Sequence, residues 1–187
     1  AVCWDADLLI PTLVHDLNNI PGNEYLFSII VPTNVHIQGS NAIKILTPGT
    51  YKIGGSIFNK TTGCGDTTWH WVYANATPTI DITYDGACMG TDIVLTANAT
   101  PALTTPHSYT YSWTSSLTGD TILGTEATLT RALTGDVTFT VVVTAHYHYT
   151  GVDAEGVSYN IDLECPATQN VFIEPDPVPV FELEVLN

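Results

Sequence analysis

Apolar and polar residues alternate along short stretches of this chain, and residues that favour turns separate the stretches. In 79–85, for example, Ile80, Ile82 and Tyr84 alternate with polar residues. A period of two is typical of a half-buried β-strand. No stretch of ten or more residues carries the apolar stripe of an amphipathic helix, and Thr, Val, Ile and Tyr, which favour strands, are abundant. The pattern therefore predicts an all-β fold.

The strand pattern runs through the chain twice. The opening AVCWDADLLI at 1–10 aligns with GACMGTDIVL at 86–95 on a cysteine, an aspartate and the apolar residues that follow. Further on, LTPGTYKIGGSI at 46–57 aligns with LTGDVTFTVVV at 133–143. Each copy then supplies a second cysteine, a strand and a Pro-containing link. Two units of the same order are a stronger signal than any single motif.

We therefore expect two tandem immunoglobulin-like (Greek-key) β-sandwich domains plus a C-terminal extension strand. The first domain spans 1–77 and the second 78–175, with a long hairpin inserted at 145–164. Residues 176–187 follow as a linker and a strand for the next unit. The 187 residues are enough for two domains of about 90 residues, each with its own core.

Two aromatic residues support the sandwich prediction. Trp113 stands in the middle of a predicted strand and is expected to pack between the sheets. Tyr51, in the pattern L-x-x-G-x-Y, is similar to the tyrosine corner that ties a turn of immunoglobulin-like domains to the backbone nearby. Phe139 takes the corresponding position of the second repeat, so its corner would lack the hydroxyl.

Composition narrows the functional classes. The chain carries 19 acidic and 4 basic residues, a net charge of −15. Nucleic acid and anionic membrane surfaces are therefore poor partners, because phosphate binding needs clustered Lys and Arg. No segment is long and apolar enough for a membrane-spanning helix, so membrane insertion is not expected. Four cysteines with no C-x-x-C pair indicate two disulfides rather than zinc, and hence an oxidising compartment outside the cytoplasm.

The second repeat resembles a known family. Its CMG opening at 88–90, its YSW strand at 111–113, a Thr- and Val-rich strand and the late Cys165 resemble the PKD-like and immunoglobulin-like repeats of Bacteroidota surface proteins. The resemblance covers 79–175 well and 1–77 loosely. It implies Greek-key sandwiches in cell-surface adhesins, gliding-motility filaments and spacer stalks, and it does not imply an enzyme.

The resemblance and the repeat together imply how the cysteines pair. With one disulfide in each repeat, the bonds are Cys3–Cys64 and Cys88–Cys165. Four cysteines allow three connectivities, and only the repeat selects this one. Loops of this size would stabilise each domain by roughly 4 kcal/mol in the chain-entropy model.

The two repeats differ in their first strand. Segment 79–85 precedes Cys88, whereas only two residues precede Cys3, and 178–187 adds a strand at the end. We therefore expect the last strand of one copy to complete the first domain of the next by donor-strand complementation. The residues assigned to this contact are Val178, Val180, Phe181, Leu183 and Val185.

The predicted function is a structural subunit or repeat unit of an extracellular cell-surface filament or adhesin, built from head-to-tail copies of the chain. Separate subunits and a covalent tandem repeat both fit the sequence. The alternative is a binding module of a surface adhesin or phage virion that recognises glycan or protein, and a third class is an accessory domain of a secreted hydrolase. The sequence contains no Ser-His-Asp order, G-x-S-x-G elbow, Walker loop or H-E-x-x-H motif, so an enzyme is not expected.

Two aromatic segments are candidate contact sites. His146, Tyr147, His148 and Tyr149 lie in the predicted hairpin, which we interpret as a contact surface for a ligand, a host or a substratum. The alternative is that the two histidines ligate a metal with a third group. In TTWHWVY at 67–73, three aromatic residues share one strand face. A sandwich core or domain joint is the favoured interpretation there, and a sugar-stacking platform is the alternative.

Calcium and glycans complete the candidate ligands. No cofactor is expected, although Asp5 with Asp7, or Asp85 with Asp92, could bind Ca²⁺ at a domain junction. Three N-x-[ST] sequons are present, and two threonines match the Asp-Thr-x pattern of O-glycosylation that the Bacteroidota resemblance suggests. The candidate glycosylation sites are Asn59, Asn75, Asn98, Thr67 and Thr121.

Overall fold

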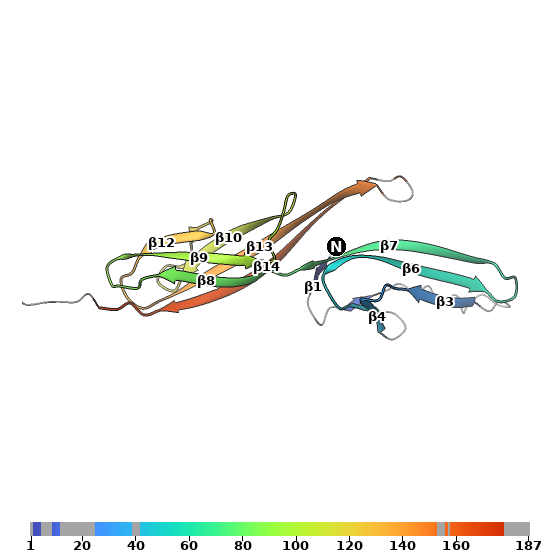
Figure 1. Ribbon diagram of the computed structural model, residues 1–187, viewed down its shortest axis with the longest axis horizontal. Coiled ribbons are helices and arrows are strands. Elements are labelled where there is room, and N and C mark those ends of the chain that lie inside the picture. Colours follow the sequence, from blue (N-terminus) through green and yellow to red (C-terminus); the bar gives the residue numbers. More distant parts are fainter. Residues whose placement is uncertain are drawn as a thin grey trace, which may run out of the picture. The chain divides into compact units, whose positions relative to one another are not determined.

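The described part of the chain is built from strands. The computed structural model describes residues 2–4, 9–11, 25–38, 42–152, 156 and 158–177. No helix is present among these residues, so the all-β prediction is confirmed. The chain divides into two compact units, Ala1–Thr77 with Thr150–Leu163, and Pro78–Tyr149 with Glu164–Asn187. Each unit holds one four-stranded and one three-stranded sheet (Figure 1).

The first unit is an immunoglobulin-like sandwich of these two sheets. The larger sheet has the order β1-β7-β6-β3, with β1 parallel to β7 and the other neighbours antiparallel. The smaller sheet has the order β2-β5-β4 and is antiparallel. The strands are β1 (Val2–Trp4), β2 (Leu9–Pro11), β3 (Tyr25–Ile30), β4 (Val35–Gln38), β5 (Ala42–Ile45), β6 (Gly49–Asn59) and β7 (Gly65–Ala76).

The core of the first unit lies between its sheets. Ile43 and Ile45 of β5 are fully buried, while Lys44 between them is only half-buried, as expected when alternate side chains face opposite sides of a sheet. They belong to one cluster with Ile53 of β6. The indole nitrogen Nε1 of Trp4 donates a hydrogen bond to the Ile45 carbonyl (2.9 Å), which ties β1 to the opposite sheet.

The second unit repeats this architecture. Its larger sheet has the order β11-β10-β13-β14 and its smaller sheet the order β12-β9-β8. The strand pairs β8–β9, β9–β12, β10–β11 and β10–β13 are antiparallel. The strands are β8 (Thr79–Asp85), β9 (Asp92–Thr100), β10 (Ser108–Ser115), β11 (Gly119–Gly124), β12 (Thr128–Ala132), β13 (Val137–Val152) and β14 (Ser158–Ile173).

Trp113 is central to the second core. Its side chain is 0% exposed and packs in a cluster with Leu95 of β9 and Val141 of β13. Its Nε1 donates a hydrogen bond to the Glu126 carbonyl (2.9 Å), so the one polar group of the ring is satisfied inside the protein. The predicted position of Trp113 between the sheets is confirmed.

The tyrosine corner is also present. The hydroxyl of Tyr51 donates a hydrogen bond to the Thr47 carbonyl four residues upstream (2.5 Å). Gly49 makes room for the ring, because a Cβ atom there would lie 3.1 Å from the Tyr51 hydroxyl oxygen. At the corresponding place of the second unit, Phe139 is 3% exposed and belongs to the core. The prediction for Tyr51 is confirmed.

The cysteines that open the two repeats hold the same position in their units. Cys3 of β1 pairs in parallel with Asn75 of β7, and Cys88 forms a parallel bridge with Asp176, just after β14. The two units differ in the sheet to which one of their strands belongs. In the first unit β4 pairs with β5 in the smaller sheet, whereas in the second unit β11 pairs with β10 in the larger sheet.

The hairpin predicted as an insertion at 145–164 is formed by β13 and β14, which are sixteen residues long each. Residues 150–163 of this hairpin group with the first unit and not with the second. Within the first unit, the hydroxyl of Tyr159 lies 2.9 Å from the hydroxyl of Tyr73 on β7. The hairpin therefore contributes its outer part to the first unit.

The cysteines do not pair as predicted. Cys64 and Cys88 carry free thiols, while Cys3 and Cys165 are disulfide-bonded, and with four cysteines in the chain this bond is Cys3–Cys165. Both predicted bonds, Cys3–Cys64 and Cys88–Cys165, are therefore wrong.

The length of the last strand in each unit explains the error. Cys3 lies beside Asn75, eleven residues along the extended chain from Cys64, a separation of roughly 35 Å at about 3.3 Å per residue. Cys88 lies beside Asp176, and the stretch of β14 from Cys165 to its end alone spans roughly 26 Å. Disulfide geometry requires Cα atoms within about 7 Å of each other.

Candidate functional site

One sheet edge differs between the two units. In the second unit β9 lies between β12 and β8, and β8 pairs with it along its whole length. Ile80 and Ile82 of β8 also pack against the core. In the first unit β2 pairs with β5, and none of the other described strands pairs with β2. The predicted donor strand, 178–187, lies outside the described residues, as do its contact residues Val178, Val180, Phe181, Leu183 and Val185.

The larger sheet of the first unit carries an exposed aromatic surface. Trp69 and Trp71 are two residues apart on β7 and therefore share a face, with 44% and 55% of their surface exposed. In the register, Gly54 of β6 lies opposite Trp69, and Lys52 lies opposite Trp71. We call Lys52, Gly54, Trp69 and Trp71 the Trp platform.

The position of the Trp69 ring depends on Gly54. A Cβ atom on Gly54 would lie 2.8 Å from Cζ3 and 2.9 Å from Cε3 of Trp69, closer than carbon atoms can approach without displacement. The indole therefore rests against the backbone of β6, where only glycine leaves room for it. β3 lies on the side of β6 away from β7, and its Ile30 is opposite Gly54 and 40% exposed. The apolar surface therefore continues across three strands.

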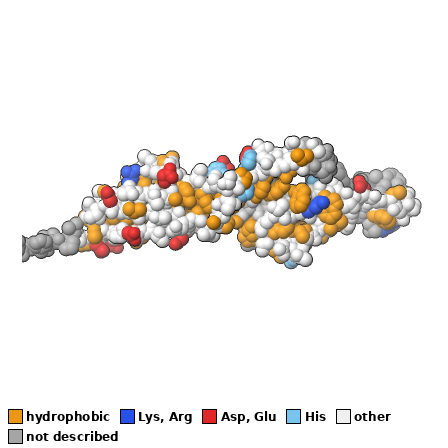
Figure 2. Space-filling model, turned by 45° about the horizontal axis from the view of Figure 1, so that its top comes forward, with side chains coloured by type: hydrophobic (Ala, Val, Ile, Leu, Met, Phe, Trp, Pro, Cys, Tyr) orange, Lys and Arg blue, Asp and Glu red, His pale blue; other side chains and the backbone are white. Residues whose placement is uncertain are grey.

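Lys52 places a positive charge on the Trp platform. Its Nζ lies 5.1 Å from the ring centroid of Trp69 and 5.9 Å from that of Trp71, within the range of a cation–π interaction. Among the described residues, no carboxylate forms an ion pair with Lys52. Figure 2 shows hydrophobic side chains gathered around a basic side chain on this part of the molecule.

The sequence interpretation of 67–73 as part of a sandwich core is wrong for Trp69 and Trp71, which are exposed, while a domain joint stays a prediction. Trp69 and Trp71 share a sheet face with Gly54 and Lys52 of β6, whereas Tyr51 and Ile53, on the other face of β6, belong to the core. The two indoles therefore lie on the face away from the core. Tyr73, on the same face as the indoles, is half-buried and has Tyr159 as its hydrogen-bonding partner. Strand periodicity places the three rings on one face, but it does not tell which part of the strand is covered.

The hairpin residues predicted as a contact surface are used largely inside the second unit. Tyr147 is only 6% exposed, so it belongs to the core and cannot serve as a surface contact. His146 is part of a polar network, because its Nε2 lies 2.8 Å from Thr110 Oγ1 and its Nδ1 lies 3.4 Å from Glu164 Oε1. Burial raises the pKa of Tyr147 to about 12, with smaller contributions from Tyr109 and Tyr149.

His107 is a member of this cluster that the sequence did not indicate. Its ring centroid lies 5.4 Å from that of Tyr147 and 5.1 Å from that of Tyr149. The backbone N–H of His148 donates to His107 Nδ1 (3.1 Å). His107 lies in the loop before β10, forty residues before Tyr147 in the sequence. No local pattern therefore predicts that the two residues meet.

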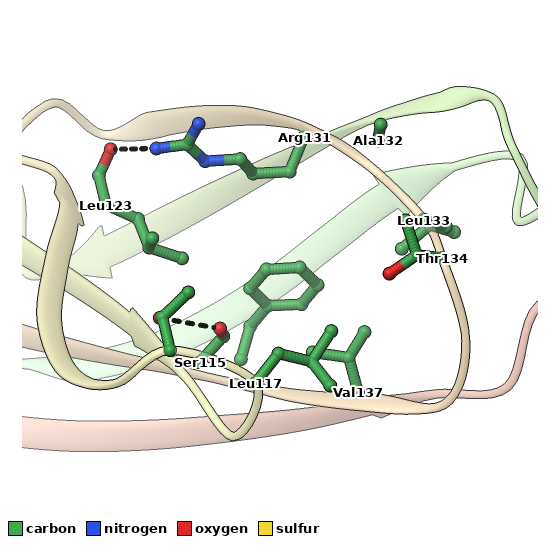
Figure 3. Close-up of a pocket in the computed structure, with 10 residues that line it drawn as sticks. Ser115, Leu117, Leu123, Arg131, Ala132, Leu133, Thr134 and Val137 are labelled. Atoms are coloured by element: carbon green, nitrogen blue, oxygen red, sulfur yellow. Dashed lines mark hydrogen bonds between the residues drawn. The ribbon is translucent and has the colours of Figure 1, made fainter.

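The second unit also contains a small cavity of about 190 Å³. It lies between the turn that follows β10 and the loop that follows β12, and apolar side chains such as Leu117, Leu133 and Phe139 line it (Figure 3). At its rim, the Arg131 guanidinium donates a hydrogen bond to the Leu123 carbonyl (2.8 Å). No carboxylate, histidine or thiol lines this cavity. Its chemistry is that of a packing gap, without groups for acid–base or nucleophilic catalysis.

The predicted metal and glycosylation sites lie partly outside the described residues and partly at buried positions. No group of three or more His, Cys, Asp or Glu residues that could hold a metal is present in the described part of the chain, and Asp5 and Asp7 lie outside it. Asn59 and Asn75 are each 7% exposed, and Asn59 Oδ1 accepts hydrogen bonds from two backbone N–H groups of its own turn. Their burial argues against glycosylation in the folded chain. Asn98, Thr67 and Thr121 are exposed and remain predictions.

Comparison with known proteins adds little to this description. No helix of the described residues could cross a membrane. No protein-family model and no curated protein matches the chain. Among solved structures, an amphioxus IgVJ-C2 molecule is similar over 84% of this chain and 94% of that chain, at 13% identity and a TM-score of 0.31. The immunoglobulin-like fold therefore rests on the sheets and cores described above.

Proposed function

We propose that this chain is a structural subunit of an extracellular cell-surface filament or adhesin, in which a strand of one copy completes the first unit of the next. The observation that supports the proposal is the edge of β2. In the second unit, β8 covers the corresponding edge of β9 and adds two isoleucines to the core. In the first unit, no other described strand than β5 pairs with β2.

The sequence of 178–187 suits a strand that pairs with this edge of β2. Phe181, Leu183 and Val185 alternate with other residues as Ile80 and Ile82 do in β8. An added strand gains affinity from backbone hydrogen bonds and specificity from alternate side chains that enter the groove. A head-to-tail contact of this kind does not close on itself, and it therefore builds an open filament.

The distribution of charge favours the same arrangement. Residues 1–77 contain five acidic and three basic residues, whereas residues 78–187 contain fourteen acidic residues and one basic residue. Residues 150–163, which belong to the first unit, hold three of these fourteen acidic residues, so the net charge is −5 for the first unit and −10 for the second. A head-to-tail contact therefore avoids the contact between two copies of the more acidic unit. The Cys3–Cys165 disulfide agrees with an oxidising, extracellular location.

The proposal is tested on the purified chain by light scattering and negative-stain microscopy. We expect the chain to form linear polymers, and Leu183→Asp to leave monomers, because a carboxylate would be buried in the receiving groove. Glu182→Gln is the matched control on the other strand face, and it should polymerise normally. A monodisperse wild-type monomer, or a Leu183→Asp chain that polymerises as well as the wild type, would refute the proposal.

A peptide of residues 178–187 provides a second test. When it is added in excess before assembly, it should bind the edge of β2 and cap the polymers at short length. A peptide with Leu183 replaced by Asp should leave the length distribution unchanged. Equal effects of the two peptides would argue against a specific strand position.

A further inference from the structure

We propose that the Trp platform is a binding site for an acidic saccharide, one that carries carboxylate groups. The inference does not depend on filament assembly, because the platform lies on the face of the β6–β7 sheet and not at the edge of β2. Lys52, Trp69 and Trp71 are the residues that would contact the ligand.

The two indoles supply the stacking surface. Trp69 and Trp71 are 44% and 55% exposed although each is large and apolar. Gly54 lets the Trp69 ring lie against the backbone of the sheet, where a Cβ atom would displace it. A sugar ring has an apolar face of C–H groups, and a flat exposed indole offers a complementary surface for it.

Lys52 selects the charge of the ligand. Its ammonium group lies within 6 Å of the ring centroids of both indoles and has no carboxylate partner among the described residues. A sugar carboxylate stacked on the platform would therefore meet a fixed cation that nothing in the described protein neutralises. The overall charge of −15 does not prevent this, because charges farther away than about 8 Å are screened at physiological salt.

Hydroxyl groups on the same sheet face provide polar contacts beside the indoles. Ser28 Oγ of β3 and Ser56 Oγ of β6 lie 2.6 Å apart. Thr67 of β7 lies opposite Ser56 and is exposed. The platform thus has an aromatic centre, one cation and a row of hydroxyls, which together match the C–H face, the carboxylate and the hydroxyls of an acidic sugar.

The test is calorimetric titration of the full chain with an oligogalacturonate, and with the methyl ester of the same oligomer as a neutral probe of equal shape. We expect the acid to bind and the ester to bind roughly tenfold or more weakly. Lys52→Met should reduce the affinity for the acid to the level of the ester. Trp71→Ala should weaken binding of both probes by roughly tenfold.

Tyr84→Ala is the matched control, because Tyr84 is 43% exposed on β8 of the second unit and should leave binding unchanged. Circular dichroism verifies that each variant is folded, and Lys52→Met keeps the inference testable if Trp71→Ala does not fold. The proposal is overturned if neither probe binds, if the ester binds as tightly as the acid, or if both platform variants bind like the wild type. It is also overturned if Trp71→Ala abolishes self-association and leaves saccharide binding intact.

Discussion

At the scale of single residues, the polar atoms of the aromatic side chains decide where each ring lies. Tyr51 is 8% exposed and satisfies its hydroxyl on the Thr47 carbonyl, and Trp113 satisfies its indole N–H on the Glu126 carbonyl. Each bond removes the cost of a buried polar group that has no partner. Trp69 and Trp71 remain at the surface, on the face of the sheet opposite to the core residues Tyr51 and Ile53.

The ionisation of Tyr147 lowers the stability of the second unit at alkaline pH. Burial raises the pKa of its hydroxyl from 10.0 to about 12, so the folded chain holds this proton more tightly than the unfolded chain. The resulting stability is complete below pH 10 and is lost as the pH rises through about 12. Tyr147→Phe should therefore flatten the fall of the unfolding free energy between these two pH values, as measured by urea denaturation.

The control for this prediction is Tyr84→Phe, which alters an exposed tyrosine of the same unit. It should leave the pH dependence unchanged. If Tyr147→Phe unfolds with the wild-type pH profile, the ionisation of Tyr147 does not contribute to the alkaline loss of stability.

At the scale of the strands, strand length determines which cysteines are too far apart to form a disulfide. Cys64 lies in the turn between β6 and β7, where a backbone hydrogen bond from the Asn59 N–H to its carbonyl (2.8 Å) holds the turn. Cys88 is held in the same way, because the Thr91 N–H and the Thr91 hydroxyl both donate to its carbonyl. Both thiols are exposed. Cys64 is too far from Cys3, and Cys88 is too far from Cys165, to form the disulfides that the repeat predicts.

Thiol labelling checks this arrangement. Under non-reducing, native conditions a maleimide reagent should modify two cysteines per chain, Cys64 and Cys88, and peptide mapping should find Cys3 and Cys165 unmodified. Reduction and unfolding should then expose all four. Cys64→Ser and Cys88→Ser should each remove one label without a change in thermal stability, because neither thiol takes part in a bond. Labelling of fewer than two thiols on the native chain would contradict the free state of these cysteines.

At the scale of the whole molecule, the division of the chain into units does not follow the order of the sequence. The long hairpin of β13 and β14 has its inner part in the second unit, while 150–163 belongs to the first. Its Tyr159 shares a hydrogen bond with Tyr73 of β7. The first unit is therefore completed by a segment that follows most of the second in the chain.

Shortening the hairpin should affect the first unit most. When 150–163 is replaced by an Asn-Gly turn, we expect faster amide hydrogen exchange around Tyr73, because β7 loses the segment that packs against it. The exchange of the core strands β9 and β10 should stay unchanged. Tyr159→Phe is the milder control, since it removes one hydrogen bond worth about 1 kcal/mol and keeps the chain length. Unchanged exchange in β7 after the deletion would show that 150–163 does not support the first unit.

The sequence alone determined the features that depend on neighbours along the chain. The period of two predicted the strands, the L-x-x-G-x-Y pattern predicted the Tyr51 corner, and the mid-strand place of Trp113 predicted its burial. Each of these follows from backbone geometry over a few residues. The alignment of the two repeats also predicted that Cys3 and Cys88 take equivalent positions in their units.

Only the tertiary structure decided the features that depend on strand length and sheet order. It placed Cys64 at the far end of β7 from Cys3, left Trp69 and Trp71 exposed, brought His107 between Tyr147 and Tyr149, and assigned 150–163 to the first unit. A periodic pattern tells which residues share a face. It cannot tell how far a strand runs past its core or which strand lies beside it, because long-range packing sets both.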